Sequence, residues 1–405
     1  MNKIEELIQL YCPNGIEFKE LGEVISALRT GLNPRENFKL NSPDAKHYYI
    51  TVRELNGFSI KVSEKTDRVD SVGLKLIQNR SKIQLGDILF SGTGTIGRTS
   101  LVTDIPNNWN VKEGIYVITP IDSIINARFL IYLVQSSQIN NQILAKADGS
   151  TVTSISMASL RKIQIPLPPL PVQEEIVRIL DKFTELEAEL EAELEARKKQ
   201  YEFYRNKLLT PVEENGKWMI NGEEVEWKML GEECVVYTGG EAPVNSIKGE
   251  FPTESLKYPI YGNGIEIYGF TDSYRIDKDA VTISSIGANT GAVYYRKAYF
   301  TPIIRLKVVI PNKDNILSKY LYYYLSSINI YSKKSSVPNM NAEDVKKLEF
   351  PIPTIAEQER IVSLLDKFES LVNDISIGLP AEIEARRKQY EYYRNKLLSF
   401  KRKES

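Results

Sequence analysis

Two long segments of the chain place apolar residues three or four positions apart. In the first, apolar side chains fall at 176, 179, 180, 183, 186, 190 and 194 and resume at Tyr201, Tyr204 and Leu208. This spacing predicts an amphipathic helix from Val172 to Leu208, which is 37 residues or about 55 Å at ~1.5 Å per residue. A second segment near the C-terminus repeats the stripe, but Gly378-Leu379-Pro380 interrupts it. We therefore expect that helix to kink or to restart.

The two helical segments are copies of each other. QEEIVRILDKF at 173–183 recurs as QERIVSLLDKF at 358–368, and RKKQYEFYRNKLL at 197–209 recurs as RRKQYEYYRNKLL at 386–398. Upstream of each copy the two halves of the chain share only a frame, and the sequences between the shared ends diverge. The repeat predicts four segments: a variable domain at 1–165, a shared helix at 166–210, a second variable domain at 211–350 and a second shared helix at 351–405.

The variable domains combine strand-like and helical patterns. Strands are predicted at Ser59 to Val62, Gly86 to Ser91, Ile115 to Pro120, Val281 to Ser285 and Ile303 to Ile310, and helices at Ala127 to Gln142 and Lys319 to Ser326. The predicted fold class is α+β: two α/β domains joined by two long antiparallel coiled-coil helices, with a pseudo-two-fold internal repeat.

The antiparallel arrangement follows from charge. Each shared helix begins acidic and ends basic, so two copies match charges and end dipoles only when they run in opposite directions. Three ELEA copies from Glu185 to Ala196 place glutamates four residues apart, where they repel. We expect Arg386, Arg387 and Lys388 opposite these glutamates, although a solvated acidic face also accounts for the pattern.

Composition excludes several classes of protein. The chain has 405 residues and a net charge of −1, so bulk electrostatics give no support for DNA binding. No apolar run approaches the roughly 18 residues of a membrane span, and the N-terminus is acidic where a signal peptide is basic. Two cysteines and a single histidine, His47, offer no disulfide framework and no metal spacing. We expect a cytoplasmic, metal-free protein.

Gly92-Thr93-Gly94-Thr95-Ile96-Gly97 matches a dinucleotide fingerprint, which requires a helix directly after it. The residues after this segment are β-branched. Residues 286–293 in the second half also lead into strand-like sequence, so a glycine-rich turn between strands is the better interpretation. The chain has no phosphate-binding loop, no adenine-methyltransferase motif and no second histidine. We therefore expect a non-catalytic protein that binds no cofactor or metal itself.

Two groups of residues are candidate binding sites. Basic residues beside turns or loops of the variable domains can reach DNA phosphates or guanine edges, or are simply solvated surface charges: Arg98, Arg296, Lys297, Lys333 and Lys334. Tyrosines recur three residues apart on the shared helices, where they pack in the helix interface or contact a partner protein: Tyr201, Tyr204, Tyr390 and Tyr393.

The duplicated blocks, separated by two unlike variable domains, resemble the specificity subunits of type I restriction-modification systems. The ELEA repeats and the GLP interruption resemble the IC-like subclass. The resemblance implies that each variable domain is a target-recognition domain for one half of a split, asymmetric site on double-stranded DNA. It also implies that the helices set the spacer and dock two methyltransferase subunits, and that restriction subunits complete the nuclease. S-adenosylmethionine, ATP and Mg²⁺ are then expected in those partner subunits.

Two other functions stay open at this point. One is a coiled-coil adaptor that binds two proteins without contacting DNA, and the other is a self-contained methyltransferase. The bases of either half-site and the spacer length do not follow from the sequence.

Overall fold

The computed structural model describes residues 3–35, 37–105, 107–149, 153–287, 289–328, 330, 340–373 and 377–403. The chain divides into two compact units. The first unit is Met1–Glu189 with Ile383–Ser405, and the second unit is Leu190–Glu382. Each unit combines one variable region with parts of both shared helical segments, so residues distant in the sequence complete each of them.

The first unit is built on a four-stranded antiparallel sheet. Its strand order is β2 (Ile25–Thr30), β10 (Ile115–Pro120), β7 (Ile88–Ser91) and β8 (Thr99–Leu101). Strand β7 is buried along its whole length, as its unbroken apolar run Ile88-Leu89-Phe90 predicts. Smaller pairings complete the unit: β6 (Arg68–Val69) with β3 (His47–Ile50) and β9 (Trp109–Val111), β1 (Phe18–Glu20) with β11 (Gln164–Pro166), and β4 (Leu55–Asn56) with β5 (Ser59–Ile60).

The described helices of the first unit outside the shared segments are short. They are α1 (Lys3–Tyr11), α2 (Ser71–Ser81), α3 (Ala127–Gln135), α4 (Ser137–Ala145), α5 (Met157–Arg161) and the 3₁₀ turn η1 (Leu21–Glu23). The single helix predicted from Ala127 to Gln142 is wrong in one respect. Ser136 is extended at ψ 147°, and its hydroxyl accepts a hydrogen bond from Ile139 N, so it caps a new helix.

The second unit repeats this frame. Its four-stranded sheet has the order β16 (Cys234–Thr238), β23 (Lys307–Pro311), β20 (Ala280–Ile283) and β21 (Val293–Arg296). The helix α8 (Ser318–Ser327) stands where the first unit has α3. The remaining elements are β12 (Val212–Glu214), β13 (Lys217–Ile220), β14 (Glu223–Glu224), β15 (Glu226–Met229), α7 (Leu230–Glu233), β17 (Ser246–Lys248), β18 (Tyr258–Tyr261), β19 (Ile267–Thr271), β22 (Thr301–Pro302), α9 (Ala342–Lys346) and β24 (Glu349–Ile352).

One predicted strand of the second unit begins later than the pattern indicates. Residues 303–310 are apolar and β-branched enough to predict a strand, but β23 starts only at Lys307. Ile304 and Arg305 have φ angles of 55° and 58°, a left-handed conformation that no strand contains. The prediction was wrong because it weighed side-chain type and could not detect the turn.

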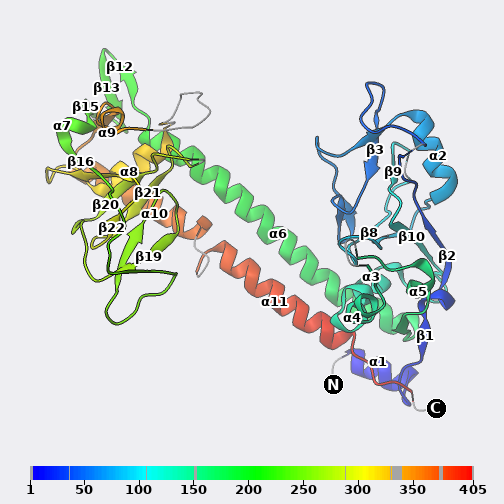
Figure 1. The fold of residues 1–405 in the computed structure, drawn as a ribbon. Coiled ribbons are helices and arrows are strands. Elements are labelled where there is room, and N and C mark those ends of the chain that lie inside the picture. Colours follow the sequence, from blue (N-terminus) through cyan, green and yellow to red (C-terminus); the bar gives the residue numbers. More distant parts are fainter. Residues whose placement is uncertain are drawn as a thin grey trace. The chain divides into compact units, whose positions relative to one another are not determined.

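The first shared segment is the continuous helix α6 (Leu170–Leu209), which spans 40 residues (Figure 1). The second shared segment is divided into α10 (Ile355–Asn373) and α11 (Leu379–Leu397), so the predicted restart at Gly378-Leu379-Pro380 is confirmed. The boundary between the units falls inside α6, after Glu189. Each end of α6 therefore belongs to a different hydrophobic core.

An aspartate anchors each shared helix to its variable region. Asp181 accepts hydrogen bonds from Arg128 (2.7 Å) and from the Tyr132 hydroxyl (2.6 Å) on α3. Its repeat partner, Asp366, accepts from Lys319 (2.7 Å) and from the Tyr323 hydroxyl (2.5 Å) on α8. The repeated block thus makes the same attachment in both units.

A repeated glutamine makes a second attachment. The Gln173 amide donates to the carbonyls of Ile124 (3.0 Å) and Pro168 (2.7 Å). Gln358 donates in the same way to the carbonyls of Asn315 (2.8 Å) and Pro353 (2.9 Å).

The helices of each unit pack antiparallel through aromatic rings. In the first unit Phe183 of α6 stacks on Tyr393 of α11, with ring centroids 5.6 Å apart. In the second unit Phe368 of α10 stacks on Tyr204 of α6, also at 5.6 Å. Because 183 corresponds to 368 and 204 to 393 in the repeat, the two contacts are one contact made twice. The internal repeat in the sequence is thus reproduced in the helix contacts of both units.

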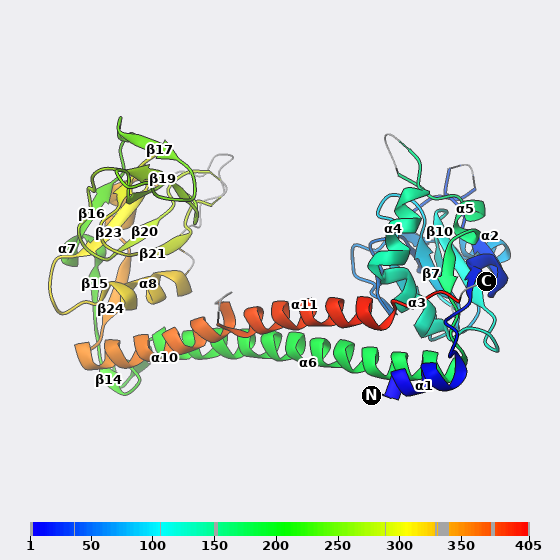
Figure 2. The same cartoon turned by 90° about the horizontal axis from the view of Figure 1, so that it is seen from below.

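Charge pairing across the helices is confirmed at one position. Arg387 Nε donates to Glu187 Oε1 at 2.6 Å, which joins α11 to the first ELEA copy. Of the other two expected cations, Arg386 contacts Gln389 and Lys388 pairs with Glu384, both on their own helix. Helix α1 lies beside the start of α6 in the first unit, where Lys3 contacts Glu175 (Figure 2).

Glu175 predicts a pH dependence of stability in the first unit. It is 5% exposed, and hydrogen bonds from Arg178, together with Lys3, hold its pKa at about 2, below the ordinary value of 4.5. Because the folded pKa is the lower one, this stabilisation is present above pH 4.5 and is lost as the pH falls towards 2. Glu175→Gln should therefore cost about 1 kcal/mol at neutral pH, a value kept small because solvent screens Arg178 and Lys3, whose side chains are 52% and 65% exposed.

Urea titrations of the whole chain at a series of pH values, followed by circular dichroism, measure this difference. The difference in the free energy of unfolding between Glu175→Gln and the wild type should shrink as the pH falls below the ordinary carboxyl pKa. Glu174→Gln, an exposed neighbour on the same helix, is the matched control and should show a small, constant difference. A Glu175→Gln gap that stays constant or widens in acid contradicts the assignment.

Candidate nucleic-acid interface

The glycine-rich segment of the first unit is a turn between antiparallel strands. Strands β7 and β8 pair with Phe90 opposite Thr99, and no helix follows the glycines. Gly94 and Gly97 have φ angles of 76° and 92°, a conformation that glycine adopts without strain. The prediction of a turn is confirmed, and the segment lacks the loop-to-helix geometry that cradles a dinucleotide.

Arg98 leaves this turn and reaches a neighbouring loop. Its backbone N–H donates to Ser91 Oγ (2.8 Å), and its guanidinium donates to the Val52 carbonyl (3.4 Å). The side chain is exposed on the surface of the first unit. This guanidinium is exposed and makes one weak contact among the described residues, so it is available to a phosphate or to a guanine edge.

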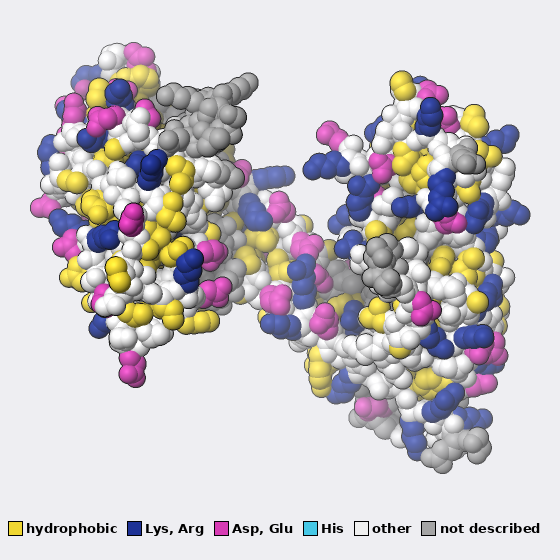
Figure 3. Space-filling model, viewed as in Figure 1, with side chains coloured by type: hydrophobic (Ala, Val, Ile, Leu, Met, Phe, Trp, Pro, Cys, Tyr) yellow, Lys and Arg dark blue, Asp and Glu magenta, His cyan; other side chains and the backbone are white. Residues whose placement is uncertain are grey.

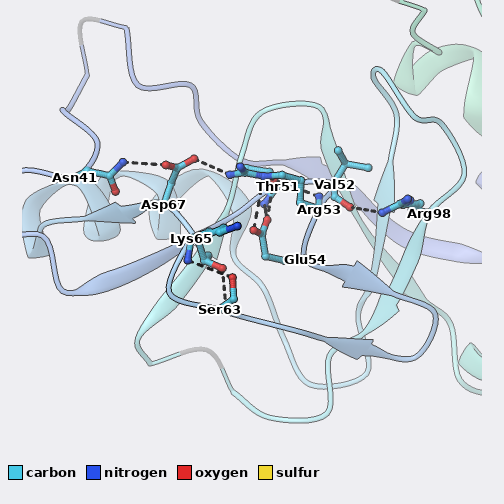
Figure 4. A network of polar contacts seen from close by, with 10 residues as sticks. Asn41, Thr51, Val52, Arg53, Glu54, Ser63, Lys65, Asp67 and Arg98 are labelled. Atoms are coloured by element: carbon cyan, nitrogen blue, oxygen red, sulfur yellow. Dashed lines mark hydrogen bonds and ion pairs between the residues drawn. The ribbon is translucent and has the colours of Figure 1, made fainter. Parts of the chain in front are cut away.

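The loop beside Arg98 is fixed by a polar network (Figure 4). Arg53 pairs with Asp67 at 2.9 Å, and Asp67 accepts from the Asn41 amide at the same distance. Glu54 is 4% exposed and accepts from both the backbone N–H (2.8 Å) and the hydroxyl (2.7 Å) of Thr51. The network holds Arg53, whose side chain is 58% exposed, on the same loop as the Arg98 contact.

The sequence alone does not single out Arg53, Asn41 or Asp67. The Thr-x-x-Glu spacing at Thr51 and Glu54 is a signal for a local side-chain-to-backbone bond, and it is satisfied here. The contacts of Asp67 with Arg53 and Asn41 span 14 and 26 residues, so no local pattern predicts them.

Arg296 is placed differently from the expectation for a DNA contact. It is 7% exposed, and its guanidinium donates to the carbonyls of Gly264 (2.8 Å) and Ile265 (2.9 Å). It also lies 3.8 Å above the Tyr261 ring, and burial lowers its pKa. Arg296 therefore holds the second unit together from inside, where a duplex cannot reach it.

The other candidate cations fall into two groups. Lys297 is 81% exposed and pairs with Asp279 at 3.3 Å, so it remains accessible to a phosphate. Lys333 and Lys334 lie outside the described residues.

The visible surfaces of the two units carry charge differently. Lysine and arginine side chains gather over the β3 and β9 end of the first unit in Figure 3. On the second unit, basic and acidic side chains alternate with apolar ones (Figure 3). A local basic surface of this kind is compatible with the overall charge of −1.

Other candidate chemistry is sparse in the part of the chain that the structure describes. His47 faces Ser71 Oγ at 3.1 Å, and Cys12 and Cys234 are free thiols. Among the described residues no three histidine, cysteine, aspartate or glutamate side chains are grouped to hold a metal ion. Over the same residues, no helix has the length and apolar character needed to cross a bilayer.

The four candidate tyrosines lie in the helix interfaces, beside an exposed aromatic edge. Tyr201 and Tyr390 flank the Phe368 and Phe183 rings at 6.5 and 6.3 Å, next to the stacked Tyr204 and Tyr393. The neighbouring residues face outward: Phe203 is 62% exposed and its repeat partner Tyr392 is 60% exposed. Each contacts the next tyrosine edge-on, at 5.4 and 5.3 Å. Large exposed aromatic rings at equivalent places in both units suit a protein partner.

Comparison with known proteins agrees with this geometry. A family model described as the type I restriction modification DNA specificity domain matches residues 13–196 and 223–385. The Escherichia coli type I restriction enzyme EcoR124I/EcoR124II specificity subunit is 41% identical over 278 residues, covering 62% of this chain and 66% of that protein. A Mycoplasma pneumoniae protein named as a type I specificity subunit is 33% identical over 294 residues, covering 68% of this chain and 83% of that one.

Two solved structures share the fold. The type I restriction-modification S subunit from M. genitalium has a TM-score of 0.55 at 20% identity and covers 95% of this chain and 96% of its own. A chain from work on complex assembly and conformational transition of the type I restriction-modification system has a TM-score of 0.62 at 18% identity, covering 95% and 98%. The present chain belongs to the family defined by the type I restriction-modification DNA specificity domain, and it contains two matches to that domain.

Proposed function

We propose that this chain is the DNA-specificity subunit of a type I restriction-modification complex, acting in the cytoplasm. Each variable region would recognise one half of a split, asymmetric site on double-stranded DNA. The proposal depends on one observation: the two units have the same secondary-structure framework but different loops on their surfaces. Both units use the same four-stranded sheet order, the same helix–aspartate attachment and the same aromatic contact, while their loops differ.

The loop surfaces supply the candidate DNA contacts. Arg98 in the first unit and Lys297 in the second are exposed and lie next to strand ends. Asp67 holds the Arg53 guanidinium on the loop whose Val52 carbonyl accepts from Arg98, which supports a second contact from the same loop. Lys333 and Lys334 remain candidates from sequence alone.

The chemistry of the complex is assigned to partner subunits. In the described part of each glycine-rich segment the chain passes from one strand to the next, without the helix that S-adenosylmethionine or nucleotide loops require. We assign S-adenosylmethionine to two methyltransferase subunits, and ATP with Mg²⁺ to restriction subunits. This chain then contributes recognition without catalysis.

The shared helices are the proposed docking sites for the methyltransferase subunits. Phe203 and Tyr392 occupy equivalent repeat positions, so one kind of partner surface fits both. Two equivalent sites predict two copies of the partner per chain. The aromatic edge suits such an interface because it is partly apolar and partly hydrated.

Removal of one ELEA copy tests the proposed function and the role of the helix together. Deleting Glu189 to Ala192 shortens α6 by about 6 Å and rotates the remainder of the helix by about 40° past a full turn. Leu186 and Leu194 become four residues apart, so the apolar stripe survives. At ~3.4 Å of rise per base pair the lost length corresponds to between one and two base pairs, and at roughly 34° of twist per base pair the lost rotation corresponds to about one. Both mismatches shrink when one base pair is removed, so we expect a spacer one base pair shorter with both half-sites unchanged.

Methylation mapping in cells that express the chain with its methyltransferase subunits provides the measurement. The unmodified chain should produce an asymmetric two-part site, and the deletion should produce the shortened one. Absence of sequence-specific methylation in the first case contradicts the specificity function. An unchanged spacer in the second contradicts the proposal that α6 sets the distance.

The exposed aromatic edge predicts the stoichiometry of docking. Phe203→Ser should leave one methyltransferase subunit bound, and Phe203→Ser with Tyr392→Ser should weaken the binding of both by at least about tenfold. Both side chains are largely exposed, so the melting temperature should not change. Mass photometry of the assembled complex counts the bound subunits.

The matched control is Glu202→Ser with Glu391→Ser, an exposed pair one position before the aromatic residues in each repeat. It should keep two subunits bound. Two subunits on the aromatic double variant, at unchanged affinity, would show that docking uses another surface.

A further inference from the structure

The second unit contains an open pocket of about 620 Å³, within the size range of small-ligand sites. It is lined by the loop after β16, residues 239–242, by Tyr268 of β19, by Ile286, and by the turn 303–305. The lining residues are mostly apolar or glycine, with one cation, Arg305, and one anion, Glu241. None of the residues assigned to DNA contact or partner docking lies in it.

The turn that forms one wall of the pocket has an unfavourable backbone conformation. Ile304 and Arg305 both have left-handed φ angles, although isoleucine is β-branched and neither residue is glycine. Their N–H groups donate to the carbonyls of Gly240 (2.8 Å) and Gly239 (3.0 Å), and the Asn263 amide donates to the Ile304 carbonyl (2.5 Å). Surrounding bonds that over-determine a strained segment are a feature of ligand-binding sites.

The first unit shows what the same turn looks like without this feature. Lys112 N donates to the Ile50 carbonyl in the first unit, and Ile303 N donates to the Tyr261 carbonyl in the second, so Lys112 corresponds to Ile303. Three residues later, Ile115 N donates to the Lys112 carbonyl, and Leu306 N donates to the Ile303 carbonyl. These bonds place Gly114, with φ 90°, at the position of Arg305. The first unit therefore uses glycine where the second unit keeps an arginine at a conformational cost. The frame of the fold does not require that arginine.

Charge around the pocket favours an anion. The Arg275 guanidinium lies against Gly240, since a Cβ there would be 3.3 Å from its nitrogen, and Lys248 lies 5.2 Å above the Tyr268 ring. Lys307, two residues after Arg305, is 5% exposed and bonds only to Thr238 Oγ1 (3.4 Å) among the described residues. Burial and the nearby Arg305 lower the pKa of Lys307. Among the lining residues Arg305 is the cation and Glu241 is the carboxylate.

We propose that this pocket binds a single nucleotide, with Arg305 on the phosphate and the base against Tyr268 and Ile304. Glu241 can accept a hydrogen bond from an exocyclic amino group, as carboxylates do with cytosine, which favours bases that carry one. Base stacking on an aromatic ring beside cations is the usual way in which proteins hold unpaired nucleotides. If the nucleotide is one displaced from a DNA duplex, the proposal rests on the DNA-recognition function proposed above and extends it. A free mononucleotide has the same chemistry.

The first arm of the test is isothermal titration of the full chain with dAMP, dCMP, dGMP, dTMP and inorganic phosphate. We expect saturable binding of at least one mononucleotide that carries an amino group, tighter than binding of phosphate alone. Arg305→Gly should weaken it by at least about tenfold, the value of a lost charge-assisted hydrogen bond. The same variant should melt at or above the wild-type temperature, because glycine relieves the left-handed strain. A folding defect is thereby separated from loss of the site.

Lys278→Ala is the control, because it removes one positive charge from an exposed position of the same unit outside the pocket lining. It should bind as the wild type does. Equal binding of nucleotides and inorganic phosphate, or mononucleotide binding that Arg305→Gly leaves unchanged, would overturn the assignment.

The second arm identifies the source of the nucleotide. The assembled complex is titrated with a duplex carrying its mapped methylation site. Weaker duplex binding by Arg305→Gly, but not by Lys278→Ala, assigns the pocket to a nucleotide of the DNA. Mononucleotide binding with unchanged duplex affinity assigns it to a free nucleotide. If no mononucleotide binds and duplex affinity does not change, the proposal of a nucleotide-binding pocket is wrong. Site-specific methylation by the assembled complex would still support the DNA-specificity function.

Discussion

The packing of one copy of the shared helix against the other is the interaction on which both units depend. The core of the first unit contains Ile176 and Leu180 from the start of α6 together with Leu398 from the end of the chain. The core of the second unit contains Leu208 and Leu209 from the end of α6 together with Ile361 and Leu365 of α10. Neither variable region has a complete core without both copies. The Phe183 and Phe368 stacks join the two copies with the same geometry at both places.

This division of labour explains how one chain can recognise two different half-sites. Attachment uses residues of the repeated blocks, chiefly Asp181 and Asp366, so the loops at the far ends of the strands are free to differ. The turn before the central strand shows such a difference within a common frame: Gly114 in the first unit and Arg305 in the second occupy equivalent positions. A stable shared frame can hold a residue in an unfavourable backbone conformation without a change of fold.

Elements with a clear periodic pattern of apolar residues or a local turn signal can be predicted from the sequence, whereas contacts between distant residues cannot. The stripe at 176–208, the GLP restart and the glycine-rich turn each follow from local chemistry, and the structure agrees with all three. The break at Ser136 was missed because a capping serine inside an apolar helix pattern looks like an ordinary polar position. The sequence predicts a surface position for Arg296 because it does not reveal that two carbonyls and a tyrosine ring enclose the guanidinium. The pocket around Arg305 was not visible for the same reason: its walls come from segments about 60 residues apart.

A fragment ending at Thr210 tests the central claim most directly. It keeps the first variable region and all of α6 but lacks the second helical copy that covers Phe183. Because Tyr204 is the repeat equivalent of Tyr393, two fragments should pair antiparallel, each covering the Phe183 of the other with its own Tyr204. Sedimentation equilibrium should show a dimer that Phe183→Ala converts towards monomer. A wild-type fragment that stays monomeric while retaining its helix content would contradict the account.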